Sequence, residues 1–408
     1  MKWPYLGVTN AFCDVLKHRR IVLSRDECRD LVSAALSSQL LFMAGPSGTG
    51  KSAVAEALAA LFTHADRRRR IQVPLGVATE SELLGYPTTI GGVLRYQPSA
   101  WLDVFQGLGP AGTAAGGAAP LVLGAQQTTP GPPSSAEICP PVMIFEEANL
   151  GTMEGYLSSF MRDFSGLSSE KVVLTLHGSN ASVERTGGGT AVPKSMEVGL
   201  WPRVIATLNV DQTAEPPSRK VAARGLAIVL EPPELTLDDL RHSVLGGGEP
   251  APPGYEYFQA LGRPTDAIQA LNVHDTALFD SVVSDVHAAA IAVAAVLKLP
   301  PIISPRNLLR MVAFTSTYLL VGLGEGEGTE SAELLRKLGL EYAVLHIVLP
   351  SLSEENFHRV REAIGTSAGM QFAPLASASA TMERSPLHRR LQTVSAGRAA
   401  TDFWSALS

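Results

Sequence analysis

The stretch that decides the fold lies near the amino end of the chain and reads Gly45-Pro46-Ser47-Gly48-Thr49-Gly50-Lys51-Ser52. A short apolar run, residues 40–44, precedes it, and apolar residues at helical spacing, residues 52–62, follow it. Strand, glycine-rich loop and helix in this order form the phosphate-binding loop pattern. Its glycines let backbone N–H groups turn toward phosphate oxygens at the positive end of the helix. We therefore expect these eight residues to bind a nucleoside triphosphate, with Lys51 at the β- and γ-phosphates and the Ser52 hydroxyl on Mg²⁺.

Two acids end the next apolar run, which reads Val142-Met143-Ile144-Phe145-Glu146-Glu147. Open α/β sheets bind ligands at the carboxyl ends of their strands, which is where these acids lie. We expect Glu146 to hold magnesium through water and Glu147 to polarise the attacking water. The usual first residue of such a pair is Asp. The extra methylene of Glu146 changes the reach to the metal, which favours weaker hydrolysis.

A third buried run, residues 204–208, ends in Asn209. An amide at this position can orient the attacking water without adding charge. Asn at a strand end is by itself more typical of a turn. Its place after the phosphate loop and the acids, in that order, is the reason to predict a catalytic role for Asn209.

Further runs carry a family resemblance. They are Leu83-Leu84-Gly85-Tyr86, Glu146-Glu147-Ala148-Asn149-Leu150-Gly151, Tyr156-Leu157-Ser158-Ser159-Phe160, Thr207-Leu208-Asn209-Val210-Asp211-Gln212-Thr213, and Ser218-Arg219-Lys220-Val221 with Arg224. With the phosphate loop, this ordered set resembles the AAA+ ATPases of the branch that contains the restriction motor McrB and, more distantly, the MoxR chaperones. The resemblance covers roughly residues 30–365.

The resemblance implies a hexameric ring with nucleotide between subunits. Arg224, with Lys220 as a second candidate, would reach the γ-phosphate of the neighbouring subunit. The family tends to have Asp before this arginine, where this chain has Ala223. Ser304-Pro305-Arg306 resembles the start of the second sensor helix of the family, so Arg306 would contact the phosphates of its own subunit; otherwise it is a surface residue of a first helical turn.

The expected fold class is α/β: a P-loop AAA+ nucleotide domain with a parallel sheet flanked by helices, followed by a helical lid domain. The expected divisions are an N-terminal helical segment, 1–35, the nucleotide domain, 36–232, with a flexible insertion at about 107–135, the lid, 233–370, and a low-complexity tail, 371–408. The basic run 67–70 is expected to be a solvated corner between the first helix of the nucleotide domain and a strand at 71–75.

Composition limits the partners and the compartment. The net charge of −6 argues against a surface that binds nucleic acid over its whole extent. The start of the chain has no apolar signal core, and the longest apolar helical run, residues 288–299, is shorter than the roughly 20 residues of a membrane span. The three cysteines form no disulfide or metal pattern. We expect a cytoplasmic protein that has no membrane contact.

Three functions are consistent with these observations. The first is the NTPase motor subunit of a bacterial anti-phage defence or restriction system, which acts with a separately encoded effector or nuclease and meets nucleic acid through that complex. The second is a MoxR-like chaperone that remodels protein partners. The third is a nucleotide-gated scaffold with weak turnover, which the Glu146 departure favours. ATP is the expected nucleotide and GTP the alternative.

Overall fold

The structure is a computed structural model of the 408-residue chain. It describes residues 5–106, 140–164, 171–210, 216–231, 262–297, 303–325, 330–365, 385–387 and 403–404. The predicted insertion at 107–135 and the predicted domain boundary at 232–233 lie outside these ranges.

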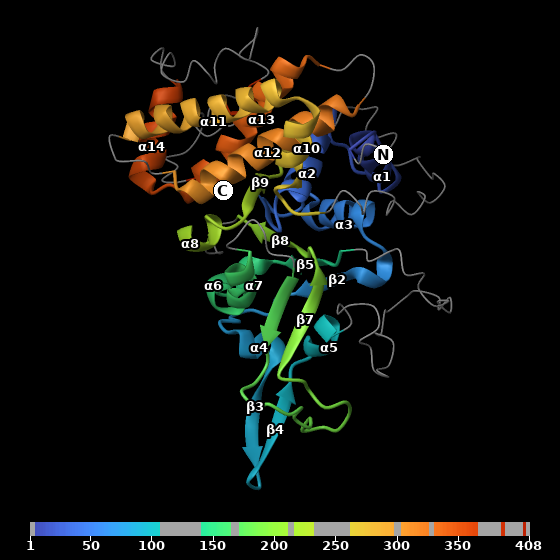
Figure 1. The fold of residues 1–408 in the computed structure, drawn as a ribbon. Helices are drawn as coiled ribbons and strands as arrows, with labels where there is room; N and C mark the ends of the chain where they lie inside the picture. Colours follow the sequence, from blue (N-terminus) through green and yellow to red (C-terminus); the bar gives the residue numbers. More distant parts are fainter. Residues whose placement is uncertain are drawn as a thin grey trace.

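A five-stranded parallel sheet forms the centre of the nucleotide domain, in the order β2-β5-β8-β1-β9 (Figure 1). The strands are β1 (Leu40–Gly45), β2 (Arg68–Gln72), β5 (Val142–Glu146), β8 (Arg203–Asn209) and β9 (Leu226–Val229). The apolar runs of β1, β5, β8 and β9 are buried, as in parallel sheets covered by helices, whereas the edge strand β2 is mostly polar. The predicted α/β class is confirmed.

Sheet register brings the predicted motifs to one edge. Gly45 of β1 pairs with Asn209 of β8, and Phe145 of β5, the residue before Glu146, pairs with Ala206 of β8. Because the strands are parallel, the phosphate loop, the two acids and Asn209 all follow carboxyl ends of neighbouring strands.

Helices α1 (Val8–His18), α2 (Arg25–Ser37) and α3 (Lys51–Phe62) belong to this part of the chain. Helix α2 begins with a capping box, in which Glu27 N donates to Ser24 Oγ (3.3 Å) and Ser24 N donates to Glu27 Oε2 (2.7 Å). Helix α3 contacts β1, β5 and β8. Its first residues therefore stand directly over the carboxyl edge of the sheet.

Two antiparallel hairpins and several short helices complete the nucleotide domain. The hairpins pair β3 (Gly85–Ile90) with β4 (Val93–Pro98), and β6 (Lys171–Thr175) with β7 (Ser195–Leu200). The helices are α4 (Glu80–Leu84), α5 (Leu102–Gln106), α6 (Met153–Tyr156), α7 (Ser158–Asp163) and α8 (Arg219–Ala222). The β3–β4 hairpin projects from the body at the end opposite the helical domain (Figure 1).

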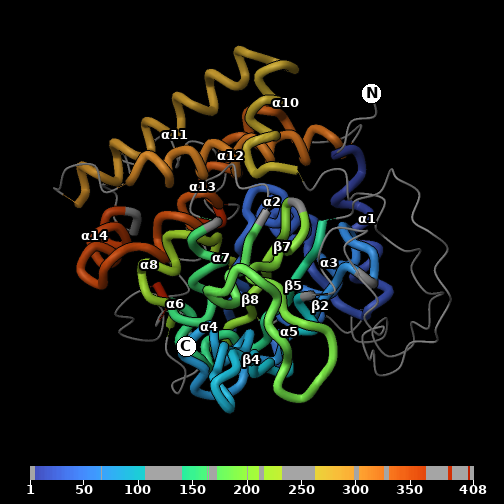
Figure 2. The backbone as a smooth tube through the Cα atoms, turned by 60° about the horizontal axis from the view of Figure 1, so that its bottom comes forward, coloured from blue at the N-terminus to red at the C-terminus, as the bar shows by residue number. Residues whose placement is uncertain are grey.

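The carboxyl-terminal part is helical and gathers on one side of the nucleotide domain (Figures 1 and 2). Its helices are α10 (Asp266–His274), α11 (Thr276–Leu297), α12 (Pro305–Leu323), α13 (Ala332–Ala343) and α14 (Glu354–Gly365). Helix α2 packs against α12, and buried Arg29 of α2 donates to both carboxylate oxygens of Glu325 (2.6 and 2.8 Å). The amino-terminal helices therefore join the two parts.

Helix α11 has 22 residues and is long and apolar enough to cross a membrane by length and composition. Residues 288–297 of the apolar run expected from the sequence form the second half of this helix, and residues 298–299 lie outside the described ranges. Within the structure, α11 packs against α10, α12, α13 and α14, and Asp285 of α11 pairs with Arg336 of α13 (2.9 Å). These contacts are those of a helix in a helical bundle.

One expectation differs from the structure. The basic run at 67–70 is not a corner, because residues 68–70 begin strand β2, so the strand expected at 71–75 starts at Arg68 and ends at Gln72. Three described residues of the predicted tail, Leu387, Phe403 and Trp404, are buried, and Trp404 Nε1 donates to Pro350 O (3.3 Å).

Candidate nucleotide-binding site

The phosphate loop has the backbone that its glycines permit. Gly48 (φ 84°) and Gly50 (φ 81°) lie in the left-handed region. A methyl group on Gly45 would overlap the carbonyl oxygen of Leu230, at the end of the neighbouring strand β9. Thr49 Oγ1 donates to Pro46 O (3.0 Å) and closes the turn. Ser47, Gly48 and Gly50 are exposed, so the loop offers its backbone to solvent.

The side chain of Lys51 lies inside this loop. Its Nζ donates to Gly45 O (2.9 Å) and Pro46 O (2.6 Å), and the residue is only 6% exposed. Ser52 is half-buried in the first turn of α3. A cation and the amino end of a 12-residue helix therefore meet where the sequence predicts phosphates.

Glu147 lies at a strained turn directly after β5. Its φ of 50° is one of three positive values among non-glycine residues of the described chain. Its backbone N donates to Thr207 Oγ1 (3.1 Å) on β8, which holds the turn in place. Strain of this kind at a loop that carries an acid is typical of functional sites.

Two amides hold the carboxylate of Glu147. Asn209 Nδ2 donates to Oε1 (3.1 Å) and Gln72 Nε2 donates to Oε2 (3.1 Å). Asn149 fixes Asn209 in turn: Asn149 Nδ2 donates to Asn209 O (2.7 Å), and Asn209 N donates to Asn149 Oδ1 (3.2 Å). The structure thus brings Glu147 and Asn209 together as predicted.

Asn149 and Gln72 were missed as functional residues. Asn149 stands in a quoted run of the family resemblance, so its position was visible in the sequence. Gln72 carried no local signal, because its contact depends on the pairing of Gln72 with Glu146 across β2 and β5.

The other acid, Glu146, is buried and bound by an arginine that the sequence analysis assigned to a solvated corner. Arg70 Nε donates to Glu146 Oε2 (2.5 Å), and Arg70 Nη1 donates to Glu56 Oε1 of α3 (2.8 Å). The hydrogen bond to Glu146 is the largest cause that raises the pKa of Arg70 above its usual value; burial opposes it, and the charges of Glu146 and Glu56 add to the rise. The Glu146 carboxylate therefore accepts a hydrogen bond from a cationic side chain at the site.

Magnesium, which the phosphate-loop pattern implies, fits the donors that are present. Ser52 and Glu146 offer hard oxygen atoms, and the guanidinium on Glu146 shows that this carboxylate accepts a positive charge. No group of three or more His, Cys, Asp or Glu side chains that could hold a metal occurs among the residues that the structure describes. A magnesium ion held by Ser52 and Glu146 would take its other ligands from phosphate and water, as Mg²⁺ does in many nucleotide sites.

We expect Glu146→Asp to keep or raise Mg²⁺-dependent hydrolysis. The shorter acid restores the usual metal distance and draws the carboxylate away from Arg70. Arg70 is exposed although Glu146 is buried. If the pair contributes about 1 kcal/mol, the upper end of the range for exposed ion pairs, the rise should stay within about fivefold. Phosphate release over a Mg²⁺ series measures it, with Glu333→Asp on the surface of α13 as the matched change. Loss of turnover in Glu146→Asp alone would mean that the site is adapted to Glu.

Three arginines lie near α8 and the start of α12. Arg224 is half-buried between α8 and β9, and Arg306 is exposed in the first turn of α12. One turn later, buried Arg310 donates from Nη1 to Ala223 O (2.9 Å), next to Arg224. Burial lowers the pKa of Arg310 to about 10, and its Nη2 has no hydrogen-bond partner among the residues that the structure describes. Arg310, which no sequence motif marked, joins α12 to the segment that carries Arg224.

Lys220, the second candidate for reaching a neighbouring subunit, is exposed and pairs with Glu154 of α6. Ser218 Oγ also donates to Glu154 (3.0 Å). The pKa of the Glu154 carboxyl is lowered, and the largest cause is the hydrogen bond from the Lys220 ammonium.

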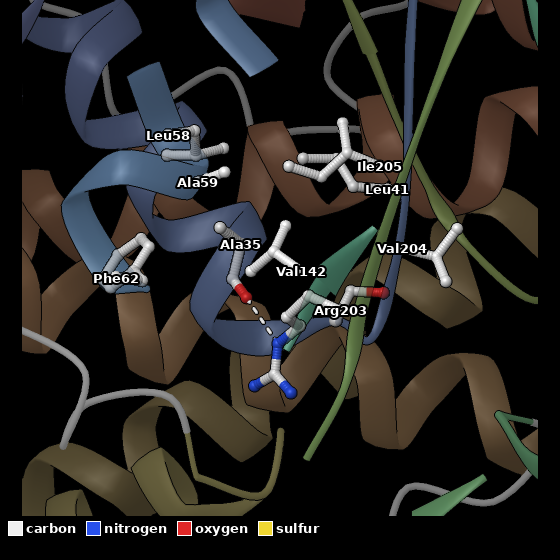
Figure 3. A pocket seen from close by; sticks show the side chains of 10 residues that line it. Ala35, Leu41, Leu58, Ala59, Phe62, Val142, Arg203, Val204 and Ile205 are labelled. Atoms are coloured by element: carbon white, nitrogen blue, oxygen red, sulfur yellow. Dashed lines mark hydrogen bonds between the residues drawn. The ribbon is translucent and has the colours of Figure 1, made fainter. Parts of the chain in front are cut away.

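A small apolar pocket lies away from these residues, at the amino ends of β5 and β8 (Figure 3). Leu58 and Phe62 of α3 line it, and Arg203 Nε donates to Ala35 O of α2 (3.0 Å). The Arg203 guanidinium also donates to Gly262 O (2.8 Å), ahead of α10, and burial lowers its pKa to about 10. Its bonds are to backbone carbonyls, so we assign this pocket a structural role.

No family model and no curated protein matches the chain. Among solved structures, a "putative ATPase" from Cytophaga hutchinsonii ATCC 33406 is 13% identical over 92% of this chain and 96% of its own, with a TM-score of 0.47. An MCM homolog from Methanopyrus kandleri is 15% identical over 84% of this chain and 60% of its own, with a TM-score of 0.36. NtrX from Brucella abortus in complex with ADP is 13% identical over 89% of this chain and 70% of its own, with a TM-score of 0.23. All three TM-scores lie below 0.5, so the proposed function rests on the residues of the site.

Proposed function

We propose that this chain is a Mg²⁺-dependent nucleoside triphosphatase of the AAA+ kind that uses ATP, with GTP as the alternative. The observation that carries the proposal is the meeting of three motifs at one sheet edge. Lys51 lies in the loop and helix that follow β1. Glu146 ends β5 and Glu147 comes directly after it, and Asn209 ends β8. Equilibrium binding of fluorescent ATP and GTP analogues, followed by phosphate release, tests it. Failure to bind either analogue would contradict the proposal.

The residues of the chain divide the work of hydrolysis. Lys51 and the loop amides hold the β- and γ-phosphates, and Ser52 and Glu146 would hold magnesium, which supplies positive charge at the phosphates. Glu147 orients the attacking water and accepts its proton, while Asn209 keeps the carboxylate in position. Each carboxylate oxygen of Glu147 accepts one hydrogen bond from an amide, and each keeps a second lone pair that can accept from the water.

We infer that the active unit is a homo-oligomer, as the AAA+ resemblance implies, with a hexameric ring as the expected form. Supporting this, Arg310 joins two segments. One carries Arg224, proposed to reach the γ-phosphate of the neighbouring subunit, and the other carries Arg306, proposed to contact the phosphates of its own subunit. The site would be completed only at the interface between two copies.

Arg224→Ala is expected to lower hydrolysis about tenfold or more while nucleotide binding stays nearly intact. This is less than the roughly 10³-fold that an arginine finger can reach, because Lys220 and Arg306 remain. Turnover, fluorescent-nucleotide affinity and sedimentation with and without nucleotide are the measurements. Arg95→Ala, an arginine of the β3–β4 hairpin paired with Glu184 (3.3 Å), is the matched control. A strictly monomeric protein with full activity would contradict the assignment.

The proposed biological role is the motor subunit of a bacterial defence or restriction system that acts with a separate effector or nuclease in the cytoplasm. A protein partner is supported by the projecting β3–β4 hairpin. Four of its apolar side chains are exposed, namely Tyr86 (51%), Ile90 (53%), Val93 (55%) and Leu94 (41%). Exposed apolar patches on soluble proteins commonly mark contact sites.

Recovery of partners from the native host with nucleotide present tests this role. A nuclease among them favours the defence role, and with it contact to nucleic acid through the complex. A remodelled protein substrate favours the MoxR-like chaperone instead. The nucleotide-gated scaffold is a third candidate, favoured by the occupation of Glu146 by Arg70 and of Glu147 by two amides. Tight nucleotide binding without turnover would support the scaffold.

A further inference from the structure

Strand β2 supplies a polar partner to each of the two acids at the site. Arg70 and Gln72 are two residues apart and therefore point to the same face of the strand. Gln72 pairs in register with Glu146 and its amide bonds to Glu147, whereas Arg70 pairs with Ile144 and reaches forward to Glu146. The amide and the guanidinium thus act on different acids.

The contact between Arg70 and Glu146 joins an exposed cation to a buried carboxylate. The Glu146 side chain is 6% exposed, whereas that of Arg70 is 56% exposed. A buried carboxylate needs a compensating charge or hydrogen bonds, and Arg70 provides both. The second bond of Arg70, to Glu56 of α3, fixes the guanidinium from the other side and keeps it near the site when the first bond opens.

We propose that Arg70 is a tethered counter-ion that competes with Mg²⁺ for Glu146 and thereby sets the magnesium requirement of the nucleotide site. This inference rests on the proposed function. When the metal binds, the guanidinium leaves Glu146 and keeps Glu56. The length of Glu146 suits this exchange, because the longer acid at the end of β5 extends further toward Arg70 on the neighbouring strand β2.

The competition follows from charge. A guanidinium and a divalent cation on one carboxylate repel each other strongly at a separation of a few ångströms, especially beside a buried group. Without metal, Arg70 neutralises Glu146, which would otherwise repel nucleotide phosphates. Arg70 therefore favours metal-free nucleotide binding and weakens the gain in affinity that magnesium brings.

The test is the affinity of the full chain for a fluorescent methylanthraniloyl derivative of ADP, measured in EDTA and over a Mg²⁺ series. The quantity compared is the ratio of the dissociation constant in EDTA to that in saturating Mg²⁺. In Arg70→Met, binding in EDTA should weaken and the ratio should rise at least about threefold, the size expected for one partly exposed ion pair. The Mg²⁺ concentration that produces half of the gain in affinity for the ADP derivative should fall by a similar factor in Arg70→Met.

Three further variants control for charge and folding. Arg95→Met removes a paired arginine elsewhere and should leave the ratio unchanged, and Arg70→Lys should lie between Arg70→Met and the unaltered protein. Arg70→Gln replaces Arg70→Met if thermal unfolding shows that the methionine disturbs the fold. An unchanged or lower ratio in the folded variants overturns the inference, as does equal weakening with and without metal, which would make Arg70 a phosphate contact. If the unaltered protein binds no nucleotide, the proposed function fails and this inference fails with it.

Discussion

Lys51→Ala should abolish nucleotide binding at micromolar concentrations. The Lys51 ammonium is almost fully enclosed by the loop and is held by Gly45 O and Pro46 O. We expect it to exchange these carbonyls for phosphate oxygens. A hydrogen bond between charged groups contributes about 1.5–3 kcal/mol, and Lys51 serves two phosphates, so the affinity should fall about 100-fold or more. Equilibrium titration with a fluorescent ATP analogue measures the loss.

The loss must be separated from damage to the fold. The two carbonyls that lose their partner lie in a loop with exposed neighbours, so water can replace the ammonium and thermal unfolding should change little. Lys194→Ala is the matched control, because Lys194 is exposed and its Nζ donates to Asn180 Oδ1 (2.9 Å). Unaltered affinity in folded Lys51→Ala would remove the phosphate-loop assignment.

Glu147→Gln should bind triphosphate and fail to turn it over. The amide has the shape of the acid but cannot accept the proton of the attacking water, and a positioned general base contributes about 10²–10⁴-fold. The change also alters the hydrogen bonds, because the new NH₂ group faces an amide donor of Asn209 or Gln72, and one of these side chains has to turn. Hydrolysis should fall about 100-fold or more, with the phosphate loop unaffected.

Two measurements identify this result. Phosphate release under multiple turnover reports the loss, and the nucleotide recovered from the protein after filtration should be intact triphosphate. Glu333→Gln, an exposed glutamate of α13 paired with Lys337 (2.8 Å), controls for the change of charge. Equal turnover in Glu147→Gln and in the unaltered chain would show that another group activates the water.

The sequence by itself determined the α/β fold and the residues of the phosphate loop, the acid pair and Asn209. Each of these signals is local: a buried apolar run predicts a strand, and the residues that end it lie at its carboxyl end. Because parallel strands place all their carboxyl ends at one edge, three local signals sufficed to predict one site. The contact between Asn209 Nδ2 and Glu147 agrees with that prediction.

Only the tertiary structure decided which side chains hold these residues. Arg70 lies 76 positions before Glu146 and Gln72 lies 75 before Glu147. Arg310 lies 87 positions after Ala223. Strand β2 is at the sheet edge and mostly polar. The strand expected at 71–75 overlaps it only at Ile71 and Gln72, because the three basic residues that begin it are typical of a solvated turn. Which acid each β2 side chain meets is set by the register between β2 and β5, and a shift of one residue would turn Arg70 to the other face of the sheet.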